Sequence, residues 1–140
     1  MFDSILLAVD ESEQSDRAVA AARDLAKLSG GQVHLFHVRE RQVVVGKGGG
    51  SFDIEQTEEA EAVLAKHAAV LEEAGVAVTS QLSHALLGHV AQEIVAAAQA
   101  CRADVIVMGS HGRTSLGALV IGSNAYKVLH IVDRPVLVVR

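Results

Sequence analysis

The chain has 140 residues, the length of one domain with a single core, so we expect one domain over residues 1–140. Hydrophobic residues make up 50% and aromatic residues 3%, so Ala, Val, Leu and Ile must build the core. The formal net charge of −5, without a cluster of Lys or Arg, argues against nucleic acid as the main partner, and no apolar run reaches the ~20 residues of a membrane span.

The first part of the chain predicts a strand, a helix and a second strand. Residues 4–10 form a nearly continuous apolar run, as expected for a strand of a parallel sheet that is buried on both faces. Ser12 or Ser15 can cap the following helix, in which apolar residues recur at helical spacing until Ser29-Gly30-Gly31 ends it. Residues 32–38 then predict the second strand.

The middle of the chain begins with a polar, glycine-rich segment over residues 39–53, which predicts a loop long enough to be functional. Residues 54–74 have the spacing of an amphipathic helix, with His67 expected on its solvated face. Residues 76–83 alternate moderately between apolar and polar side chains. This alternation predicts a third strand with one wetter face, at an edge of the sheet.

The last part of the chain predicts two more strands and two more helices. The helices are expected over residues 90–101 and 123–131, and the strands over residues 104–108 and 135–139. Strands and helices therefore alternate strictly along the whole chain. Strict alternation predicts the α/β class, with one doubly wound domain in which helices cover both faces of a parallel sheet.

Ligands of such sheets bind beyond the carboxyl ends of the strands, at the point where the strand order reverses. Two candidate residues stand at carboxyl ends, since Asp10 ends the first strand and Gly109 follows the fourth. If these two strands are neighbours, Asp10 and the loop after Gly109 share one crevice. The residues by themselves leave this adjacency open.

The segment from Gly109 to Asn124 combines a strand end, a glycine-containing loop and a helix N-terminus, which together can present backbone N–H groups to a phosphate. Gly109 can allow a ligand to approach the backbone closely, and Gly112 can adopt a left-handed turn conformation. The donors expected to face the phosphate are the free N–H groups of Gly122, Ser123 and Asn124, the Ser123 hydroxyl and the Arg113 guanidinium. Glycines of an ordinary turn around a helix cap would leave a similar pattern, so both interpretations remain open.

The spacing of these glycines matches a known signature. Gly109, two residues, Gly112, nine residues and Gly122-Ser123 reproduce the pattern G-x2-G-x9-G-S/T, and the chain resembles the ATP-binding branch of the universal stress protein family over essentially its whole length. Further shared landmarks are the opening Ile-Leu-Leu-Ala-Val-Asp10-Glu-Ser12, the pair His37-Val38, the run from Ala103 to Arg113 and the closing Arg134-Pro135-Val-Leu-Val-Val-Arg140.

The resemblance implies a five-stranded parallel sheet in the order 3-2-1-4-5, which places strands one and four side by side. It also implies a bound ATP or AMP, with Mg²⁺ held through the phosphates and no metal cage made by the protein alone. The residues implied to contact the adenine and ribose are Ala8, Val9, Asp10, Met108, Gly109 and, through its backbone, Val38. The residues implied to surround the phosphates are Gly112, Arg113, Gly122, Ser123 and Asn124.

The function implied by the resemblance is that of a stress-response regulator that changes its partner or loop state with nucleotide occupancy. Two alternatives remain open. One is a slow Mg-dependent ATPase that uses the same site, although no catalytic residue can be assigned and His111 is as well explained by a solvent-facing role. The other is a nucleotide-free dimeric interaction module that retains the loop only as structure.

The remaining features concern metals, compartment and assembly. The seven histidines lack the spacing of metal ligands, so no metal site is predicted, and Cys101 is the single cysteine, so an internal disulfide is excluded. The first residues lack the basic segment of a secretion signal, which favours a soluble cytoplasmic protein without a membrane or nucleic-acid partner. The apolar edge strand Pro135–Val139 predicts an antiparallel homodimer, as the resemblance also implies.

Overall fold

The computed structural model describes residues 1–43, 46–53, 56–111 and 121–140. Its elements in chain order are β1 (Ser4–Ala8), α1 (Glu13–Ser29), β2 (Gln32–Val43), β3 (Ser51–Asp53), α2 (Thr57–Glu73), β4 (Val78–Leu86), α3 (Val90–Ala100), β5 (Val105–Gly109), α4 (Ser123–Ile131) and β6 (Val136–Val139). The parallel strands lie in the order β4-β2-β1-β5-β6. Since β4, β5 and β6 are the third, fourth and fifth predicted strands, the predicted order 3-2-1-4-5 is confirmed.

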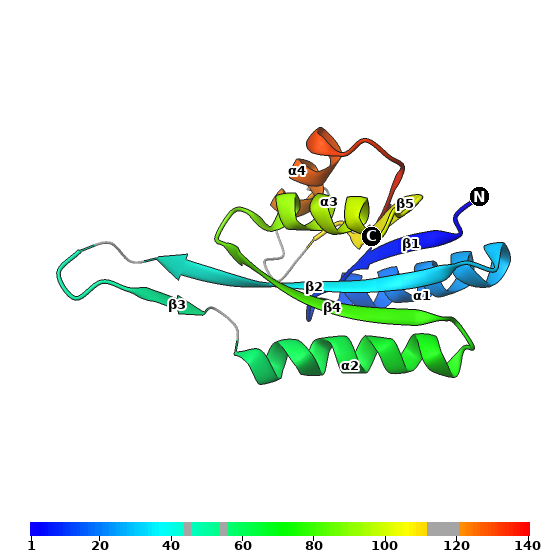
Figure 1. Ribbon diagram of the computed structural model, residues 1–140, viewed down its shortest axis with the longest axis horizontal. Coiled ribbons are helices and arrows are strands. Elements are labelled where there is room, and N and C mark those ends of the chain that lie inside the picture. Colours follow the sequence, from blue (N-terminus) through cyan, green and yellow to red (C-terminus); the bar gives the residue numbers. More distant parts are fainter. Residues whose placement is uncertain (44–45, 54–55, 112–120) are drawn as a thin grey trace.

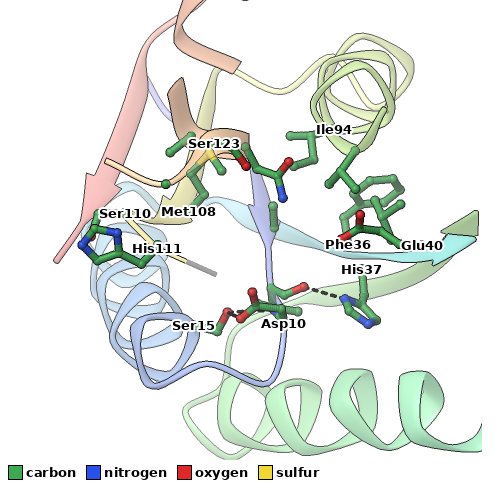
Figure 2. A pocket seen from close by; sticks show the side chains of 18 of the residues that line it. Asp10, Ser15, Phe36, His37, Glu40, Ile94, Met108, Ser110, His111 and Ser123 are labelled. Atoms are coloured by element: carbon green, nitrogen blue, oxygen red, sulfur yellow. Dashed lines mark hydrogen bonds between the residues drawn. The ribbon is translucent and has the colours of Figure 1, made fainter. Parts of the chain in front are cut away.

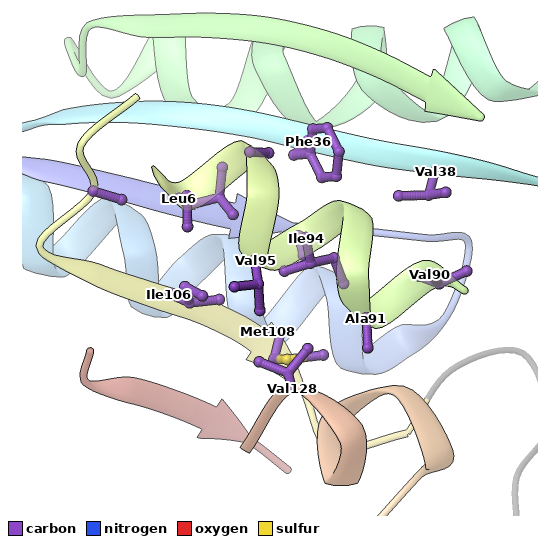
Figure 3. Close-up of a cluster of buried hydrophobic side chains, with 14 of the residues drawn as sticks. Leu6, Phe36, Val38, Val90, Ala91, Ile94, Val95, Ile106, Met108 and Val128 are labelled. Carbon is purple, nitrogen blue, oxygen red and sulfur yellow. The ribbon is translucent and has the colours of Figure 1, made fainter. Parts of the chain in front are cut away.

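Alternating side chains of the central strands fill two separate cores, one on each face of the sheet. In β1, Ile5 and Leu7 pack with α1 and α2, whereas Leu6 and Ala8 pack with α3 and α4. Figure 1 shows this three-layer arrangement, and Figure 3 shows the second core, in which Ile94 of α3 lies over the sheet. Each fully buried Val, Leu or Ile side chain contributes roughly 1.5–3 kcal/mol. These aliphatic side chains therefore suffice to hold the layers together with few aromatic residues.

The first helix begins and ends as its sequence predicts. Of the two candidate caps, Ser12 is the N-cap, and its hydroxyl accepts a hydrogen bond from the Ser15 N–H at 3.3 Å. Gly30 ends the helix in the left-handed conformation, with φ at 72°. A residue with a Cβ is strained in that conformation, which explains the glycine. The position of Ser12 sets the geometry of the turn between β1 and α1.

The segment predicted as a loop over residues 39–53 is instead a hairpin, so this prediction is wrong. β2 continues to Val43, and β3 returns antiparallel to it, with Arg41 paired to Asp53. β4 also runs further than predicted, and its parallel pairing with β2 extends to Leu86 opposite Arg41. The hairpin extends away from the helices (Figure 1), and its many charged residues and glycines obscured the strand signal of the β-branched run Val43-Val44-Val45 in the sequence.

Both edges of the sheet agree with the predicted order. β4 pairs with β2, and its largely exposed residues confirm a third strand with a wetter face at an edge. β6 pairs with β5 at the opposite edge, where Leu137 remains 41% exposed. In the ranges that the structure describes, none of the helices is both long and apolar enough to span a membrane.

Candidate functional site

A cavity of about 520 Å³ lies at the carboxyl ends of β1, β2 and β5. β1 and β5 are neighbours, with Ala8 paired to Met108. The crevice that was expected if these two strands are neighbours is therefore present. The predicted residues that line it are Ala8, Val9, Asp10, Val38, Met108, Gly109, Gly122, Ser123 and Asn124. Gly112 and Arg113 lie outside the described residues. Figure 2 shows how side chains from β1, β2, β5 and the start of α4 face this space.

Asp10 is fixed in the cavity wall by the turn that follows β1. Its Oδ1 atom accepts hydrogen bonds from the Ser12 N–H at 2.8 Å and from the Ser15 hydroxyl at 2.9 Å. The Ser15 Oγ atom also accepts the Asp10 N–H at 2.7 Å, and Ser15 is 3% exposed. One carboxylate oxygen is thus committed to the turn, which leaves Oδ2 as the acceptor that can meet a ligand hydroxyl.

Two buried histidines contact the same turn from the face of the sheet opposite to α3 and α4. The His37 Nδ1–H donates to the Val9 carbonyl oxygen at 2.6 Å (Figure 2), and His67 Nε2 lies 3.4 Å from the Asp10 carbonyl oxygen. Consecutive carbonyl groups of the turn therefore face imidazole nitrogens. This arrangement holds the backbone that carries the Asp10 carboxylate.

The prediction of a solvated His67 is wrong, because the side chain is 2% exposed. It lies between Leu64 and Leu71 in sequence, at the spacing of the buried stripe of α2, so helical periodicity could have identified it. Burial lowers the pKa of His67, and this effect outweighs the opposing hydrogen bond to the Asp10 backbone. The neutral imidazole is therefore the form that the folded chain favours.

The N-terminus of α4 opens into the cavity, but not all of its predicted donors are available. The Gly122 N–H donates to the Ser110 carbonyl oxygen at 2.6 Å, so the prediction that this group is free is wrong. The first helical hydrogen bond runs from the Tyr126 N–H to the Gly122 carbonyl at 3.0 Å. The backbone N–H groups of Ser123, Asn124 and Ala125 precede it and lack a partner within the helix. These donors, with the positive end of the helix dipole, favour an anion.

Gly109 has a structural role that the sequence did not reveal. A Cβ atom at this position would lie 2.7 Å from the Cβ atom of Gln14 and 3.2 Å from its carbonyl carbon. The glycine therefore allows the first turn of α1 to pack against the end of β5. Gly109 also lines the cavity, and close approach of a ligand to its backbone stays a prediction. Substitution of Gly109 would consequently disturb packing as well as any binding.

Two polar atoms in the cavity wall are buried without a hydrogen-bond partner among the described residues, namely Ser110 Oγ and His111 Nδ1. Ser110 is 3% exposed. A buried polar group without a partner costs about 1–3 kcal/mol, so a ligand that supplies a partner gains affinity. The charged side chains that line the cavity are Asp10 and Glu40, and no Lys or Arg from the described ranges lines it.

Other lining residues were missed, and they are Ser15, Phe36, His37, Glu40, Leu87, Gly88, Val90, Ile94, Ser110 and Ala125. Phe36 and Glu40 could have been found from Val38, because residues two apart in a strand share a face. The residues of α3 carry no such signal, since their position depends on how the helix crosses the sheet.

Comparison with known proteins identifies the family of the chain. The family model described as "Universal stress protein family" matches residues 1–140. The chain belongs to the universal stress protein family. A universal stress protein of Thermus aquaticus, encoded in a "QAH/OAS sulfhydrylase 3'region", is 35% identical over 144 residues, which cover 100% of both chains.

Solved structures of universal stress proteins share the fold. That of protein MJ0577 from Methanocaldococcus jannaschii superposes with a TM-score of 0.79 at 28% identity, covering 99% of this chain and 96% of that one. The Archaeoglobus fulgidus universal stress protein in complex with dAMP superposes with a TM-score of 0.73 at 23% identity, covering 100% of both chains. At that identity the second likeness bears on the fold alone.

Proposed function

We propose that this universal stress protein binds ATP or AMP in the cavity and acts as a stress-response switch whose partner or loop state follows nucleotide occupancy. The observation that carries the proposal is the meeting of three chemically different walls in one crevice. Apolar side chains of β2 and α3 suit a base, the Asp10 carboxylate suits ribose hydroxyls, and the first turn of α4 suits phosphates. The Archaeoglobus fulgidus protein, which shares the fold, was solved in complex with dAMP, a nucleotide with the same adenine base.

The dimensions of the cavity support a nucleotide. Its volume of about 520 Å³ lies within the ~300–1,000 Å³ that is typical of small-molecule sites. The three walls follow the strand order β5-β1-β2, and neighbouring strands are ~4.8 Å apart, so the site extends over ~10 Å. Such a span accommodates phosphate, ribose and base in sequence across the strand ends.

The charges of the wall support Mg²⁺ as a companion of the phosphates. Among the described residues the lining contributes Asp10 and Glu40 but neither Lys nor Arg, so a bare polyphosphate would meet net negative charge. Mg²⁺ commonly binds through substrate phosphates with few protein ligands, and it would neutralise that charge. Within the described chain, no group of three or more His, Cys, Asp or Glu side chains could hold a metal ion alone. We further propose that Gly112 and Arg113 contact the phosphates.

The proposal is tested by calorimetry with ATP and AMP, each with and without Mg²⁺. Ser123→Asp places a negative charge where the phosphate is proposed, whereas an acidic residue in the first turn favours the helix itself. We expect binding to weaken by at least tenfold without loss of helix stability. The matched control is Thr57→Asp, which introduces the same acidic residue at the first position of α2, outside the cavity lining. If the unchanged protein binds neither ATP nor AMP, the proposal is wrong.

Binding is favoured over hydrolysis because the acidic group nearest the α4 end already has a structural role. Asp10 Oδ1 is engaged by the Ser12 N–H and the Ser15 hydroxyl, and efficient hydrolysis requires a group that orients water at the γ-phosphate. The slow ATPase therefore remains the weaker proposal. Phosphate release that persists through purification and disappears in His111→Ala would favour it, since His111 Nδ1 is a cavity atom lacking a described partner.

We also propose a homodimer in the cytoplasm that pairs through the strand Pro135–Val139. Support comes from exposed apolar side chains beside this edge, which are Tyr126, Leu129, Ile131 and Leu137. An exposed apolar edge strand is a template for pairing with a second chain, and a two-fold axis would make that pairing antiparallel. Native mass spectrometry of the purified protein measures both subunit number and any retained nucleotide.

A further inference from the structure

Glu40 is a carboxylate inside an otherwise apolar part of the cavity. It follows Phe36 and Val38 on the same face of β2, because residues two apart in a strand point to one side. Figure 2 labels Glu40 among the side chains that line the cavity. Near Glu40 the lining residues are Val38 on β2 and Leu87 and Gly88 after β4, and none of these three carries a polar side chain that would compete with the carboxylate.

The position of Glu40 separates it from the other polar groups of the site. The α4 N-terminus lies at the β5 end of the cavity, Asp10 follows β1 in the middle, and Glu40 lies on β2 at the far end. Two strand spacings of ~4.8 Å across the sheet and an offset of four residues along β2, at ~3.3 Å each, put the Glu40 backbone ~16 Å from Met108 of β5. It is thus too far away to bind a metal ion that bridges the phosphates, since Mg²⁺ ligands lie ~2.1 Å from the ion.

The chemistry of the carboxylate restricts what it can recognise. An ionised carboxylate accepts hydrogen bonds and donates none. In the described chain, its oxygen atoms form neither a hydrogen bond nor an ion pair, whereas the neighbouring Asp10 carboxylate is engaged by its own turn. A ligand group opposite Glu40 must therefore be an N–H or O–H donor, and a keto oxygen there would be repelled.

We propose that Glu40 is a specificity-determining residue that selects a nucleobase with an exocyclic amino group, such as adenine, over a base with a keto oxygen at that edge. The inference rests on the proposed nucleotide function, and it adds a contact by which the base is read. A hydrogen bond to a charged group is stronger than one between neutral groups. A base with a keto oxygen loses this bond and places an oxygen opposite the carboxylate instead. This difference discriminates strongly between two ligands of equal shape.

The test compares Mg-ATP with Mg-inosine triphosphate, which replaces the 6-amino group by a keto oxygen. We expect the unchanged protein to bind ATP at least tenfold more tightly by calorimetry, a difference of ~1.4 kcal/mol. Glu40→Gln should reduce the ratio to about threefold or less, because the amide can also donate to the keto oxygen. The control Glu73→Gln makes the same change at the exposed end of α2 and should leave the ratio unaltered.

Each other outcome is informative. Equal affinities of the unchanged protein for the two nucleotides overturn the inference while the nucleotide function stands. An unaltered ratio in a folded Glu40→Gln variant overturns it as well, as does a variant that changes the ratio of ATP to 2′-deoxy-ATP instead, since Glu40 would then read the ribose. Binding of neither nucleotide by the unchanged protein removes the nucleotide function and the inference together. Thermal melting of Glu40→Gln establishes that the variant is folded.

Discussion

The Ser15 hydroxyl holds Asp10 by two hydrogen bonds, donating to the carboxylate Oδ1 at 2.9 Å and accepting from the backbone N–H at 2.7 Å. Both bonds form within the turn between β1 and α1, so the carboxylate is placed before any ligand arrives. A preorganised group does not have to be ordered during binding, and affinity gains accordingly. Ser15 is therefore a positioning residue for the proposed ribose contact.

Replacement of Ser15 by Ala should weaken nucleotide binding by about threefold to tenfold, because Asp10 would then sample several rotamers. The free energy of unfolding should also fall by about 1–3 kcal/mol, since the part-buried Asp10 N–H would lose its acceptor. Calorimetry and urea unfolding measure the two effects. Ser12→Ala is the matched control. It removes a helix cap worth about 1 kcal/mol but keeps the hydrogen bond from the residue 12 backbone N–H to Asp10 Oδ1. An equal loss of affinity in both variants would contradict the positioning role.

Replacement of Ser110 by Ala should separate stability from binding. Its Oγ atom is buried and lacks a partner in the described part of the chain, so removing it should leave the unfolding free energy of the ligand-free protein unchanged or slightly raised. Nucleotide affinity should nevertheless fall by about threefold to tenfold, because a hydroxyl donor in the cavity wall is lost. Urea unfolding without ligand and calorimetry with Mg-ATP test the two halves. A loss of stability greater than 1 kcal/mol would mean that the hydroxyl is already satisfied in the free protein.

The sequence predicted those features that depend on local pattern. The buried run of β1, the spacing of α1 and the glycine at its end are properties of neighbouring residues, and each was found. The adjacency of β1 and β5 needed the family resemblance, because periodicity does not order strands. The use of the Gly122 N–H by Ser110, and of the Gly109 surface by Gln14, arises where distant segments meet. No local pattern records such contacts, so the Gly122 N–H was wrongly predicted to be free and the packing role of Gly109 was missed.

His67 should make the stability of the protein depend on pH. Burial lowers its pKa in the folded state below the ordinary value of 6.5, so the unfolded chain binds the proton first as the pH falls. The free energy of unfolding should therefore decrease as the pH drops below about 6.5 and level off once the pH is below the folded-state pKa. Above that window His67 is neutral in both states and contributes no pH dependence.

Urea unfolding from pH 5 to pH 8, in roughly half-unit steps, measures this dependence. His67→Gln should flatten the decrease below pH 6.5, because the amide can donate to the Asp10 carbonyl without titrating. His130→Gln is the control, since that histidine is exposed at the end of α4. If the variant and the unchanged protein lose stability in parallel below pH 6.5, His67 is not the group responsible.

A single charge on the C-terminal edge strand should prevent the proposed dimer. Leu137 is 41% exposed at the centre of β6, and a lysine there would place two charges close together across a two-fold axis. We expect Leu137→Lys to be monomeric by light scattering at concentrations where the unchanged protein is dimeric, with its melting temperature nearly unaltered at low concentration. Gln81→Lys is the matched control, because it adds the same charge to an exposed position of β4 at the opposite edge. Disruption by Gln81→Lys but not by Leu137→Lys would place the interface on β4 instead.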